Sequence, residues 1–436
     1  MRRRPQRRRR RLAAVLPLLL LAGGLSACSS SGSSKTPTIT FYNQPSSDTA
    51  QDAAIALCNK QAHGAYKIEF VKLPSAADGQ RQQLVRRLAA KDSSIDLMGL
   101  DVTWEAEFWG AGWISEWTGA NKQAITKDAL TAPLATATVD GHLVAAPFTS
   151  NIQLLWYRKD LVPTPPKTWA EMIAMSKKLA AQGKPSFVEE QGAQYEGLTV
   201  WFNSLVASAG GSILNAKGTA PTLGAPAVQA AKVMKEVATA KGVADPSLSV
   251  NMEDQGRLAM EAGSAAFEIN YPYVWPSMQA DKPKVKTYNG KSLLDNFAWA
   301  PIPSVTAGKA GKSSIGGIDV AVSKYSRHKS QDFAAAKCLV STASQEILAN
   351  QGGLPPVGRS LYENPPKDFA KAYPFYKLIE QQLAIGAVRP RTAAYQSVSI
   401  VISHTLSPPG SISPKSSIAS LKSQIEDALH SKGLIP

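Results

Sequence analysis

Polar and aromatic side chains recur where the chain is expected to leave a strand or begin a helix, and their types could do chemistry. Asn43 and Asp101 follow apolar strand-like segments, Asn151 stands in an extended segment, and Glu253 begins a helical pattern. Carboxylates and amides accept hydrogen bonds from hydroxyl groups, and aromatic rings pack against the apolar C–H faces of sugars. The pattern therefore favours sugar binding. The same regions add Asn270, Trp104, Tyr271, Tyr273 and Trp275.

Each of these residues also has a purely structural explanation. A tryptophan at helical spacing, such as Trp104, more often packs in a core than against a ligand. Glu253 could simply favour the positive end of a helix. Taken singly they are weak indications, so the hypothesis depends on their coming together in one cleft.

The sequence contains few motifs that are typical of enzymes. None of the five histidines has the spacing that places two zinc ligands on one helix face, and no Gly-x-Ser-x-Gly motif follows the leader. Residues 311–313 resemble the end of a phosphate-binding loop, but Thr306 stands where its first glycine should be. A secreted glycosidase with Asp101 and Glu253 as its carboxylate pair stays an alternative. We expect no catalytic activity, no metal and no cofactor.

The N-terminus has the composition of an export signal. Eight arginines in residues 2–11 precede an uncharged apolar run over residues 12–22, and Leu-Ser-Ala-Cys follows at 25–28. The run is too short for a membrane span, and an arginine-rich nucleic-acid arm would not need the apolar run or the cysteine. Residues 1–28 therefore predict a lipoprotein signal peptide, exported by the general or the twin-arginine route, with Cys28 as the lipid attachment point. The predicted location is the extracytoplasmic face of the cell membrane.

Charge and cysteine content limit which partners and which compartment the rest of the chain can have. Loss of the eight leader arginines lowers the formal charge from +15 to +7 and leaves no long basic stretch, so no nucleic-acid partner is expected. Residues 29–36 predict a flexible tether, and the length that remains predicts two domains. Cys58 and Cys338 are then an even pair in an oxidising compartment. We expect one disulfide between them, although two separate buried thiols are an alternative.

The first third of the chain alternates strands and helices. Apolar strand patterns cover residues 38–43, 66–73 and 95–100, and helical patterns cover residues 48–63 and 80–90. Such a βαβαβ run predicts an α/β fold with a parallel sheet covered on both faces. Ligands of such sheets gather at the carboxyl ends of the strands.

The remainder predicts a second, more helical region. Residues 143–157 run extended and residues 297–302 run back, so we expect the chain to cross between two lobes there. Helical patterns cover residues 168–182, 198–209, 225–241, 253–262, 368–385 and 416–430, with a strand at 265–270. After the crossing back come a strand at 316–322 and a helix at 329–342, which belong to the first lobe if Cys338 meets Cys58.

Several longer segments resemble a known family. They are similar to actinobacterial sugar-binding lipoproteins of ABC importers, which belong to family 1 of the extracellular solute-binding proteins, and most of all to the LpqY-type trehalose receptors. The resemblance covers nearly the whole chain after the leader, Cys58 and Cys338 included. The segments that carry it are Leu-Val-Arg-Arg-Leu (84–88), Asp-Leu-Met-Gly-Leu-Asp-Val-Thr-Trp-Glu-Ala-Glu-Phe (96–108), Gly-Ala-Gly-Trp (110–113), Ala-Pro-Phe-Thr-Ser-Asn-Ile-Gln-Leu-Leu-Trp-Tyr-Arg (146–158), Glu-Gly-Leu-Thr-Val-Trp-Phe-Asn-Ser-Leu (196–205), Gln-Gly-Gly-Leu-Pro (351–355) and Ala-Val-Arg-Pro (387–390).

The resemblance implies roles for the charged and amide residues. Asp101 matches an aspartate that accepts sugar hydroxyls, and Asn151 matches its amide partner at the crossing between lobes. Glu253 matches an acidic ligand contributed by the other lobe. Arg389 matches an arginine whose planar fork holds two adjacent hydroxyls.

The resemblance also extends to uncharged residues. Gly316 and Gly317 match glycines whose bare backbone lets the sugar approach closely. Tyr271 stands where the family has tryptophan, a change that bears on affinity or on sugar preference. Asn43 and Gln80 fit the site by position only.

The fold implied is a two-lobed, type II periplasmic-binding-protein-like fold with hinge crossings between the lobes. We expect residues 37–148 and 304–355 in the N-terminal lobe and residues 149–303 and 356–436 in the C-terminal lobe. The lobes would close on trehalose or a related disaccharide. The loaded protein, expected to be a monomer tethered by its lipid, would then dock on ABC permease subunits in the membrane. A different oligosaccharide is the alternative ligand.

Overall fold

The computed structural model describes residues 36–45, 49–285 and 287–432. The predicted signal peptide with Cys28, and the predicted tether apart from Thr36, lie outside these residues. Within the part that is described, no helix is both long enough and apolar enough to cross a membrane.

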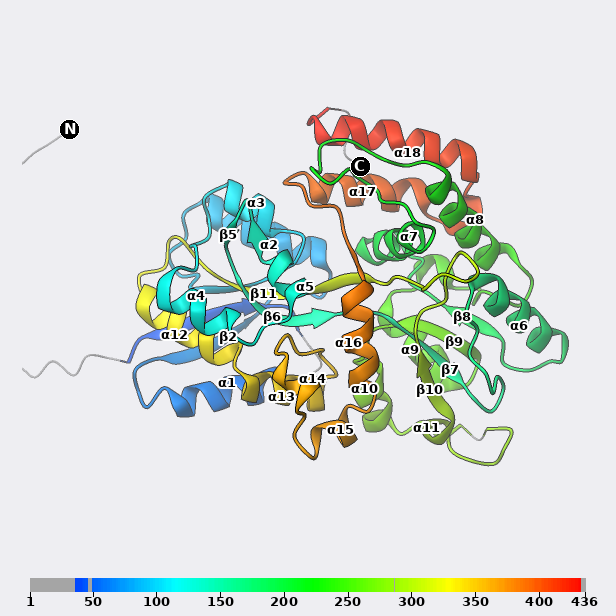
Figure 1. Cartoon of the computed structure of the whole chain (residues 1–436), viewed down its shortest axis with the longest axis horizontal. Helices are drawn as coiled ribbons and strands as arrows, with labels where there is room; N and C mark the ends of the chain where they lie inside the picture. Colours follow the sequence, from blue (N-terminus) through cyan, green and yellow to red (C-terminus); the bar gives the residue numbers. More distant parts are fainter. Residues whose placement is uncertain (1–35, 46–48, 286, 433–436) are drawn as a thin grey trace, which may run out of the picture. The chain divides into compact units, whose positions relative to one another are not determined.

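Six strands form the first sheet, on the left of Figure 1. Its order is β12-β11-β3-β1-β2, and β6 also pairs with β11. The three N-terminal strands are parallel, as the βαβαβ pattern predicts, whereas β11 runs antiparallel to β3 and β6. The strands are β1 (Thr38–Asn43), β2 (Lys67–Lys72), β3 (Leu97–Asp101), β6 (Ala146–Asn151), β11 (Ser314–Val322) and β12 (Ala387–Val388).

Helices cover both faces of the first sheet. Because successive strand residues point to opposite faces, Phe41 and Tyr42 of β1 enter two different apolar clusters. Phe41 meets Phe148 edge-on at 5.9 Å between ring centroids. The helices of this region are α1 (Thr49–Gln61), α2 (Ala77–Ala89), α3 (Glu105–Gly110), α4 (Gly119–Thr126), α5 (Thr131–Thr136), α12 (Lys329–Leu339) and α13 (Thr342–Gly352), with a hairpin of β4 (Thr138–Val139) and β5 (His142–Leu143).

Four strands form the second sheet, on the right of Figure 1, in the order β10-β7-β9-β8. They are β7 (Leu154–Arg158), β8 (Phe187–Glu189), β9 (Ala265–Asn270) and β10 (Phe297–Ala300). The helices that follow β7 in the chain, apart from α12 and α13, are α6 (Trp169–Ala181), α7 (Glu196–Ser208), α8 (Ala225–Thr239), α9 (Glu253–Ala262), α10 (Val274–Asp281), α11 (Leu293–Asn296), α14 (Ser360–Glu363), α15 (Phe369–Ala372), α16 (Tyr376–Ile385), α17 (Tyr395–Leu406) and α18 (Pro414–Leu429).

The chain leaves the first sheet within the extended segment 143–157, a few residues after the lobe boundary expected at 148–149. Strand β6 stays hydrogen-bonded to β11 up to Asn151, which pairs with Gly316, and β7 begins at Leu154 in the second sheet. The crossing therefore lies at residues 152–153 rather than at 148–149. Strand β12, expected in the other lobe, pairs with the start of β11. The cause in both cases is the length of β11, whose nine residues offer pairing partners beyond β3.

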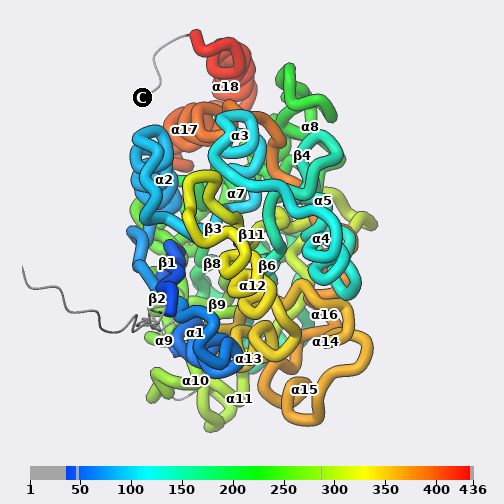
Figure 2. The backbone as a smooth tube through the Cα atoms, turned by 90° about the vertical axis from the view of Figure 1, so that its left-hand side faces the viewer, coloured from blue at the N-terminus to red at the C-terminus, as the bar shows by residue number. Residues whose placement is uncertain are grey.

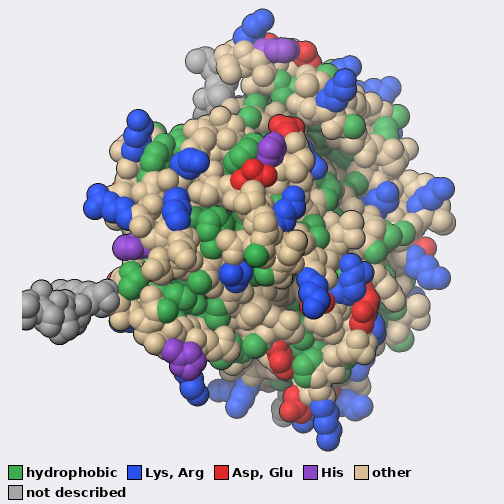
Figure 3. Space-filling model, turned by 60° about the vertical axis from the view of Figure 1, so that its left-hand side comes forward, with side chains coloured by type: hydrophobic (Ala, Val, Ile, Leu, Met, Phe, Trp, Pro, Cys, Tyr) green, Lys and Arg blue, Asp and Glu red, His purple; other side chains and the backbone are tan. Residues whose placement is uncertain are grey.

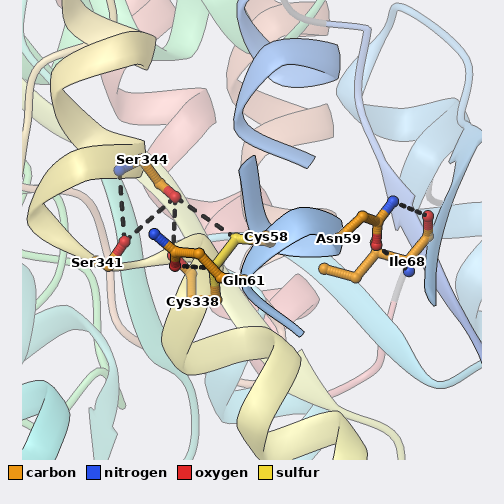
Figure 4. Close-up of a disulfide and its surroundings, with 7 residues drawn as sticks. All are labelled: Cys58, Asn59, Gln61, Ile68, Cys338, Ser341 and Ser344. Carbon is orange, nitrogen blue, oxygen red and sulfur yellow. Dashed lines mark hydrogen bonds between the residues drawn. A yellow bond between two sulfur atoms is a disulfide. The ribbon is translucent and has the colours of Figure 1, made fainter. Parts of the chain in front are cut away.

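A disulfide joins Cys58 in α1 to Cys338 in α12, as predicted, and links positions 280 residues apart in the chain. Figure 4 shows the bond with the hydroxyl of Ser344 beside it, and Ser344 Oγ lies 3.6 Å from Cys58 Sγ. In Figure 2 these helices lie side by side in front of the first sheet, together with α13. A late segment of the chain is thereby covalently tied to the first helix.

Charged side chains are dispersed on the surface that Figure 3 displays. Lysine and arginine side chains stand singly among polar and apolar ones on this face, with a few acidic side chains between them. Nucleic-acid-binding surfaces usually gather basic side chains into a stripe or patch, and this face carries none.

Candidate functional site

Strand β11 brings the polar ends of its neighbours together. Its residue Ile318 lies opposite Asp101 of β3, and Gly316 lies opposite Asn151 of β6. The start of β11 pairs with β12, where Val388 lies opposite Ile315, so Arg389 follows directly beside Gly316. Three segments far apart in the sequence thus deliver an aspartate, an asparagine and an arginine to one edge of the first sheet.

The facing wall is built from the beginnings of two helices. Glu196 is the first residue of α7, with Tyr195 before it, and Glu253 is the first residue of α9. Unpaired N–H groups and the helix dipole make a helix N-terminus favourable for a carboxylate. Tyr271 follows β9 and lines the same cavity, and Glu253, Arg389 and Glu196 all influence the pKa of its hydroxyl.

A cavity of about 150 Å³ separates the two walls. Eight of the nine predicted ligand residues line it, which leaves Asn43 as the exception. Those eight are Gln80, Asp101, Asn151, Glu253, Tyr271, Gly316, Gly317 and Arg389; the other lining residues are Gln44, Ser75, Ala76, Ala77, Thr149, Tyr195, Glu196, Gly197, Val200, Met252, Ile318 and Leu354.

Arg389 joins a carboxylate from each wall. Its Nη2 donates to Asp101 Oδ1 at 2.8 Å, and its Nη1 donates to Glu196 Oε1 at 2.6 Å. The guanidinium is almost completely buried, with 3 % of the side chain exposed. Burial alone would lower the pKa of Arg389, but Asp101, Tyr395 and Glu196 raise it well above the ordinary arginine value. The guanidinium is therefore a permanent cation that bridges the cavity.

Glu196 is held by more than the arginine. The hydroxyl of Tyr395 donates to Glu196 Oε1, and the hydroxyl of Ser399 donates to Oε2. Both donors belong to α17, and the ring of Tyr395 also lies 5.8 Å from the Arg389 guanidinium. Burial raises the pKa of Glu196, while Arg389 and the two hydroxyls oppose that rise. The carboxylate of Glu196 thus serves to position Arg389.

Asp101 and Asn151 differ in how far their oxygens are satisfied. Oδ1 of Asp101 accepts three hydrogen bonds, from Arg389 Nη2, from the Thr103 backbone N–H at 3.0 Å and from the Thr103 hydroxyl at 2.7 Å. By contrast, Asn151 Oδ1 is buried and accepts none from the described part of the chain. A buried acceptor without a donor costs about 1–3 kcal/mol, so a ligand hydroxyl would be favoured at this point.

The second wall carries groups that favour a neutral state. Burial raises the pKa of Glu253 above its usual range, against the smaller lowering effects of its own backbone N–H and of Tyr195. Burial also raises the pKa of the Tyr271 hydroxyl, and the nearby Glu253 adds to the rise. No ion pair reaches Glu253 from the residues that the structure describes. Around Glu253 and Tyr271, this wall therefore offers hydrogen-bonding groups rather than a balanced pair of charges.

The two adjacent glycines have different reasons to be glycine. Gly317 has a φ of +141°, and a Cβ there would stand 2.3 Å from the carbonyl oxygen of Thr149. At Gly316 a Cβ would meet nothing nearer than Asn151 Cβ at 3.5 Å, with Arg389 Nη2 at 3.8 Å. A glycine is thus required at position 317 by the backbone conformation and the neighbouring strand. At position 316 there is room for a side chain, and the glycine leaves that room to the cavity.

Asn43 does not line the cavity. It is buried at the end of β1, and its Nδ2 donates to Gln51 Oε1 at 2.9 Å. Its Oδ1 occupies the place that a Cβ on Gly99 would take, so the side chain packs within the sheet region. The next residue, Gln44, lines the cavity instead, because successive residues of an extended chain point to opposite sides.

Of the remaining candidates, Gln80 holds a loop beside the cavity, and the tryptophans pack against apolar clusters. Gln80 Nε2 donates to the Ser75 carbonyl at 3.0 Å, which fixes the loop before α2 against the cavity. Trp104 stacks on Phe108 at 6.3 Å in an apolar cluster, as its spacing on a helix indicated. Trp275 is half-buried and packs against an apolar cluster.

Tyr195 and Glu196 are two of the lining residues that analysis of side-chain pattern missed. The apolar pattern placed the helix start at residue 198, and Tyr195 is an N-terminal neighbour without a capping side chain. A serine, threonine or aspartate at this place would have marked the helix start. The resemblance of residues 196–205 to a family segment was a signal for Glu196, and no such segment includes Tyr195.

Comparison with known proteins places the chain in a family. Residues 44–346 match the family described as bacterial extracellular solute-binding protein. The chain belongs to this family. A probable ABC transporter-binding protein of Deinococcus radiodurans is 28 % identical over 340 residues, which cover 74 % of this chain and 76 % of that protein. Membership of an extracellular family agrees with the predicted extracytoplasmic location.

Solved structures of solute-binding proteins show the same fold. Maltose-bound MalE3 of T. maritima is 25 % identical, with a TM-score of 0.79 over 90 % of this chain and 99 % of the other. An ABC transporter solute-binding protein of Thermotoga lettingae, bound with α-D-tagatose, is 19 % identical, with a TM-score of 0.78 over 90 % and 100 % of the two chains. The predicted two-lobed, type II α/β fold is thereby confirmed.

Proposed function

We propose that the chain is the substrate-binding lipoprotein of a bacterial ABC sugar importer and that it binds trehalose or a related disaccharide in the cavity between Asp101 and Glu253. The family is one of solute-binding proteins, and the relative from Deinococcus radiodurans is described as an ABC transporter-binding protein. The loaded protein would pass its sugar to a permease in the membrane.

The observation that carries the proposal is the set of incompletely satisfied polar atoms around one cavity. Asn151 Oδ1, Tyr195 Oη and Arg389 Nε are each buried and make no hydrogen bond of ordinary geometry in the described part of the chain, although the Glu253 carboxyl lies near Tyr195 Oη. Two donors and an acceptor in one buried space suit a ligand with several hydroxyl groups, because each hydroxyl can both donate and accept. A ligand that met all three would remove three separate desolvation costs.

The size of the cavity bears on the mechanism. About 150 Å³ is less than the roughly 300 Å³ at the lower end of ordinary small-molecule sites, so two hexose rings need the walls to separate first. A hinge at the crossing near residues 152–153 supplies such a movement in two-lobed proteins. Binding is then capture followed by closure, in which the ligand replaces contacts that now join the walls.

A panel of sugars tests the proposal. Thermal melting and calorimetry of the chain from residue 29 onward, with trehalose, maltose, sucrose and glucose, should show one disaccharide binding well above the others. A ligand at 100 times its Kd stabilises the folded state by about 2.7 kcal/mol, which is readily detected. Unchanged melting with all four sugars would contradict the disaccharide assignment. Asp140→Asn changes an exposed position outside the cavity, so this variant should respond to the sugars as the unmodified chain does and serves as the control.

Another oligosaccharide is the second candidate, and a specific observation favours it. The maltodextrin-binding protein MdxE of Bacillus subtilis is 28 % identical over 202 residues, and that match spans 44 % of each protein. Stronger stabilisation by maltose or longer maltodextrins than by trehalose would select this candidate. Turnover of a chromogenic glycoside, lost in Asp101→Ala, would instead indicate the glycosidase.

Lipid anchoring at Cys28 is a separate part of the proposal. A single cysteine after Leu-Ser-Ala, preceded by a basic and apolar leader, is typical of a lipoprotein signal. Expressed in an actinobacterial host, the full chain should fractionate with membranes, and Cys28→Ala should lower that fraction. Equal membrane association of both proteins would argue against the anchor.

A further inference from the structure

Tyr195 occupies an unusual place at the start of α7. Its backbone is extended, with φ of −160° and ψ of −175°, and its side chain folds back over the first turn of the helix. A Cβ added to Gly197 would stand 2.2 Å from Tyr195 Oη and 2.3 Å from Cζ. The ring can therefore lie here only because residue 197 has no side chain.

The hydroxyl group at the far end of the Tyr195 ring is buried. Tyr195 Oη is buried, lines the cavity wall and makes no hydrogen bond of ordinary geometry with the described residues. Burial raises the pKa of this hydroxyl well above the usual tyrosine value, and the neighbouring Glu253 carboxyl raises it further. The hydroxyl thus keeps its proton and stays a donor at every physiological pH.

Glu253 complements that donor. It begins α9, its backbone carbonyl accepts a hydrogen bond from Asn270 Nδ2 at 2.9 Å, and its carboxyl lies close enough to Tyr195 for each to change the other's pKa. One wall of the cavity therefore presents a donor and an acceptor side by side. Such an arrangement suits two neighbouring hydroxyls of a sugar ring, of which one accepts while the other donates.

We propose that Tyr195, positioned by Gly197, is a ligand-binding residue that works with Glu253 to select a sugar carrying two adjacent hydroxyls. The inference rests on the proposed sugar-binding function and adds to it a specificity element in the second wall. Tyr195 would contact the ligand directly, and Gly197 would act only through the place it leaves for the ring.

The direct test compares the preferred sugar with its monodeoxy analogues. Wild-type protein should bind one deoxy analogue at least about 100-fold more weakly, since a site built to hydrogen-bond a hydroxyl rejects a ligand that lacks it. Tyr195→Phe keeps the ring and removes the hydroxyl. It should bind the parent sugar more weakly and bind that same analogue almost as well as the parent. This loss of discrimination is a result that a merely structural role of Tyr195 would not produce.

Gly197 is tested through its coupling to Tyr195. Gly197→Ala alone should weaken sugar binding at least as much as Tyr195→Phe, because the new methyl group displaces the ring. In a Tyr195→Ala background the same change should have little further effect, which a double-mutant cycle measures. Gly110→Ala is the matched control: this residue also lies in a helix, and a Cβ there meets nothing within 4 Å.

The outcomes separate the inference from the function on which it rests. Additive effects of the two changes, or a Tyr195→Phe protein that retains wild-type affinity and discrimination, would overturn the inference while leaving sugar binding intact. A wild-type protein that binds none of the sugars would remove the proposed function, and the inference with it. Circular dichroism and melting of each variant show whether the fold is retained.

Discussion

The two walls of the cavity are built by different kinds of secondary structure, strand ends in one wall and helix N-termini in the other. In the first wall, Asp101 and Asn151 stand at strand ends whose spacing is set by pairing with β11. In the second wall, Glu196 and Glu253 stand at the first residues of helices α7 and α9. A sheet places its side chains by register, whereas a helix end offers a favourable field and free N–H groups.

The carboxylates of the cavity also differ in how their charge is balanced. Asp101 of the first wall and Glu196 of the second are both bound by Arg389, which comes from the segment after β12. Glu253 has no such cation among the described residues, and burial raises its pKa. Ion pairs to Arg389 therefore join the two walls, whereas the part of the cavity around Glu253 has hydrogen-bonding groups without an ion pair among the described residues.

Removal of the shared cation should have the largest effect. Arg389→Ala leaves Asp101 and Glu196 without their guanidinium, and breaking a buried ion pair in this way typically costs about 3–5 kcal/mol. We expect a clear fall in melting temperature and loss of measurable sugar binding by calorimetry. Arg391→Ala removes an exposed arginine two residues away and is the control. Equal effects of both changes would contradict the bridging role.

Neutral substitutions of the acidic residues sharpen the contrast between the walls. Asp101→Asn should weaken sugar binding by about 2–3 kcal/mol, roughly 30–160-fold, because a charged hydrogen-bond acceptor is lost and Arg389 keeps one carboxylate instead of two. Glu253→Gln should cost only about 1 kcal/mol, since burial already favours the neutral form. Calorimetric titration of both variants measures the difference. A larger loss in Glu253→Gln would reverse the assignment.

The adjacent glycines provide a comparison within the first wall. Gly317→Ala should destabilise the fold by about 1–3 kcal/mol, because alanine at a φ of +141° is strained and its methyl group meets Thr149. Gly316→Ala should leave stability nearly unchanged and act on sugar affinity instead. Denaturant unfolding separates the two effects. The same stability loss at both positions would show that the distinction is wrong.

Buried carboxyls beneath each wall should make stability depend on pH. Burial raises the pKa of Asp319 in β11 to about 8 and that of Glu268 in β9 to about 8. Because the folded-state values lie above the unfolded ones, the stabilisation is full below about pH 4 and is lost as pH rises through 8. Asp319→Asn should therefore melt increasingly above wild type between pH 5 and 9.

Glu268→Gln should follow the same trend and show whether the two walls respond alike. Asn270 donates to Glu268 Oε1 at 2.6 Å, and this bond partly supports the ionised form. Asp319 instead has acidic neighbours, Glu105 and Asp101, which influence its pKa. Exposed Asp140→Asn should show no pH-dependent difference from wild type. A flat difference in Asp319→Asn across this pH range would contradict the raised pKa.

Sequence analysis succeeded where local pattern and register agree. The strand over residues 38–43 and the helix over residues 253–262 have the predicted bounds, and the end of β3 placed Asp101 correctly at the cavity. Arg389 could be named only from family resemblance, because nothing local in its sequence shows that β12 pairs with β11. Whether these residues bind a sugar stays a prediction.

The failures have physical causes. Asn43 was assigned to the site from its place at a strand end, but the side chain of the last strand residue points into the sheet region and that of Gln44 into the cavity. Tyr195 was missed because its position depends on the missing side chain of Gly197, a tertiary fit with no periodic signal. Helix α17, which supplies Tyr395 and Ser399, was not predicted at all.

The bond between Cys58 and Cys338 encloses most of the polypeptide in one covalent ring. A protease that cut any exposed loop within residues 59–337 would leave both fragments joined, so the nicked molecule would migrate as one species until a reductant was added. For a protein expected to work outside the cytoplasm, such damage need not release either half of the binding cavity.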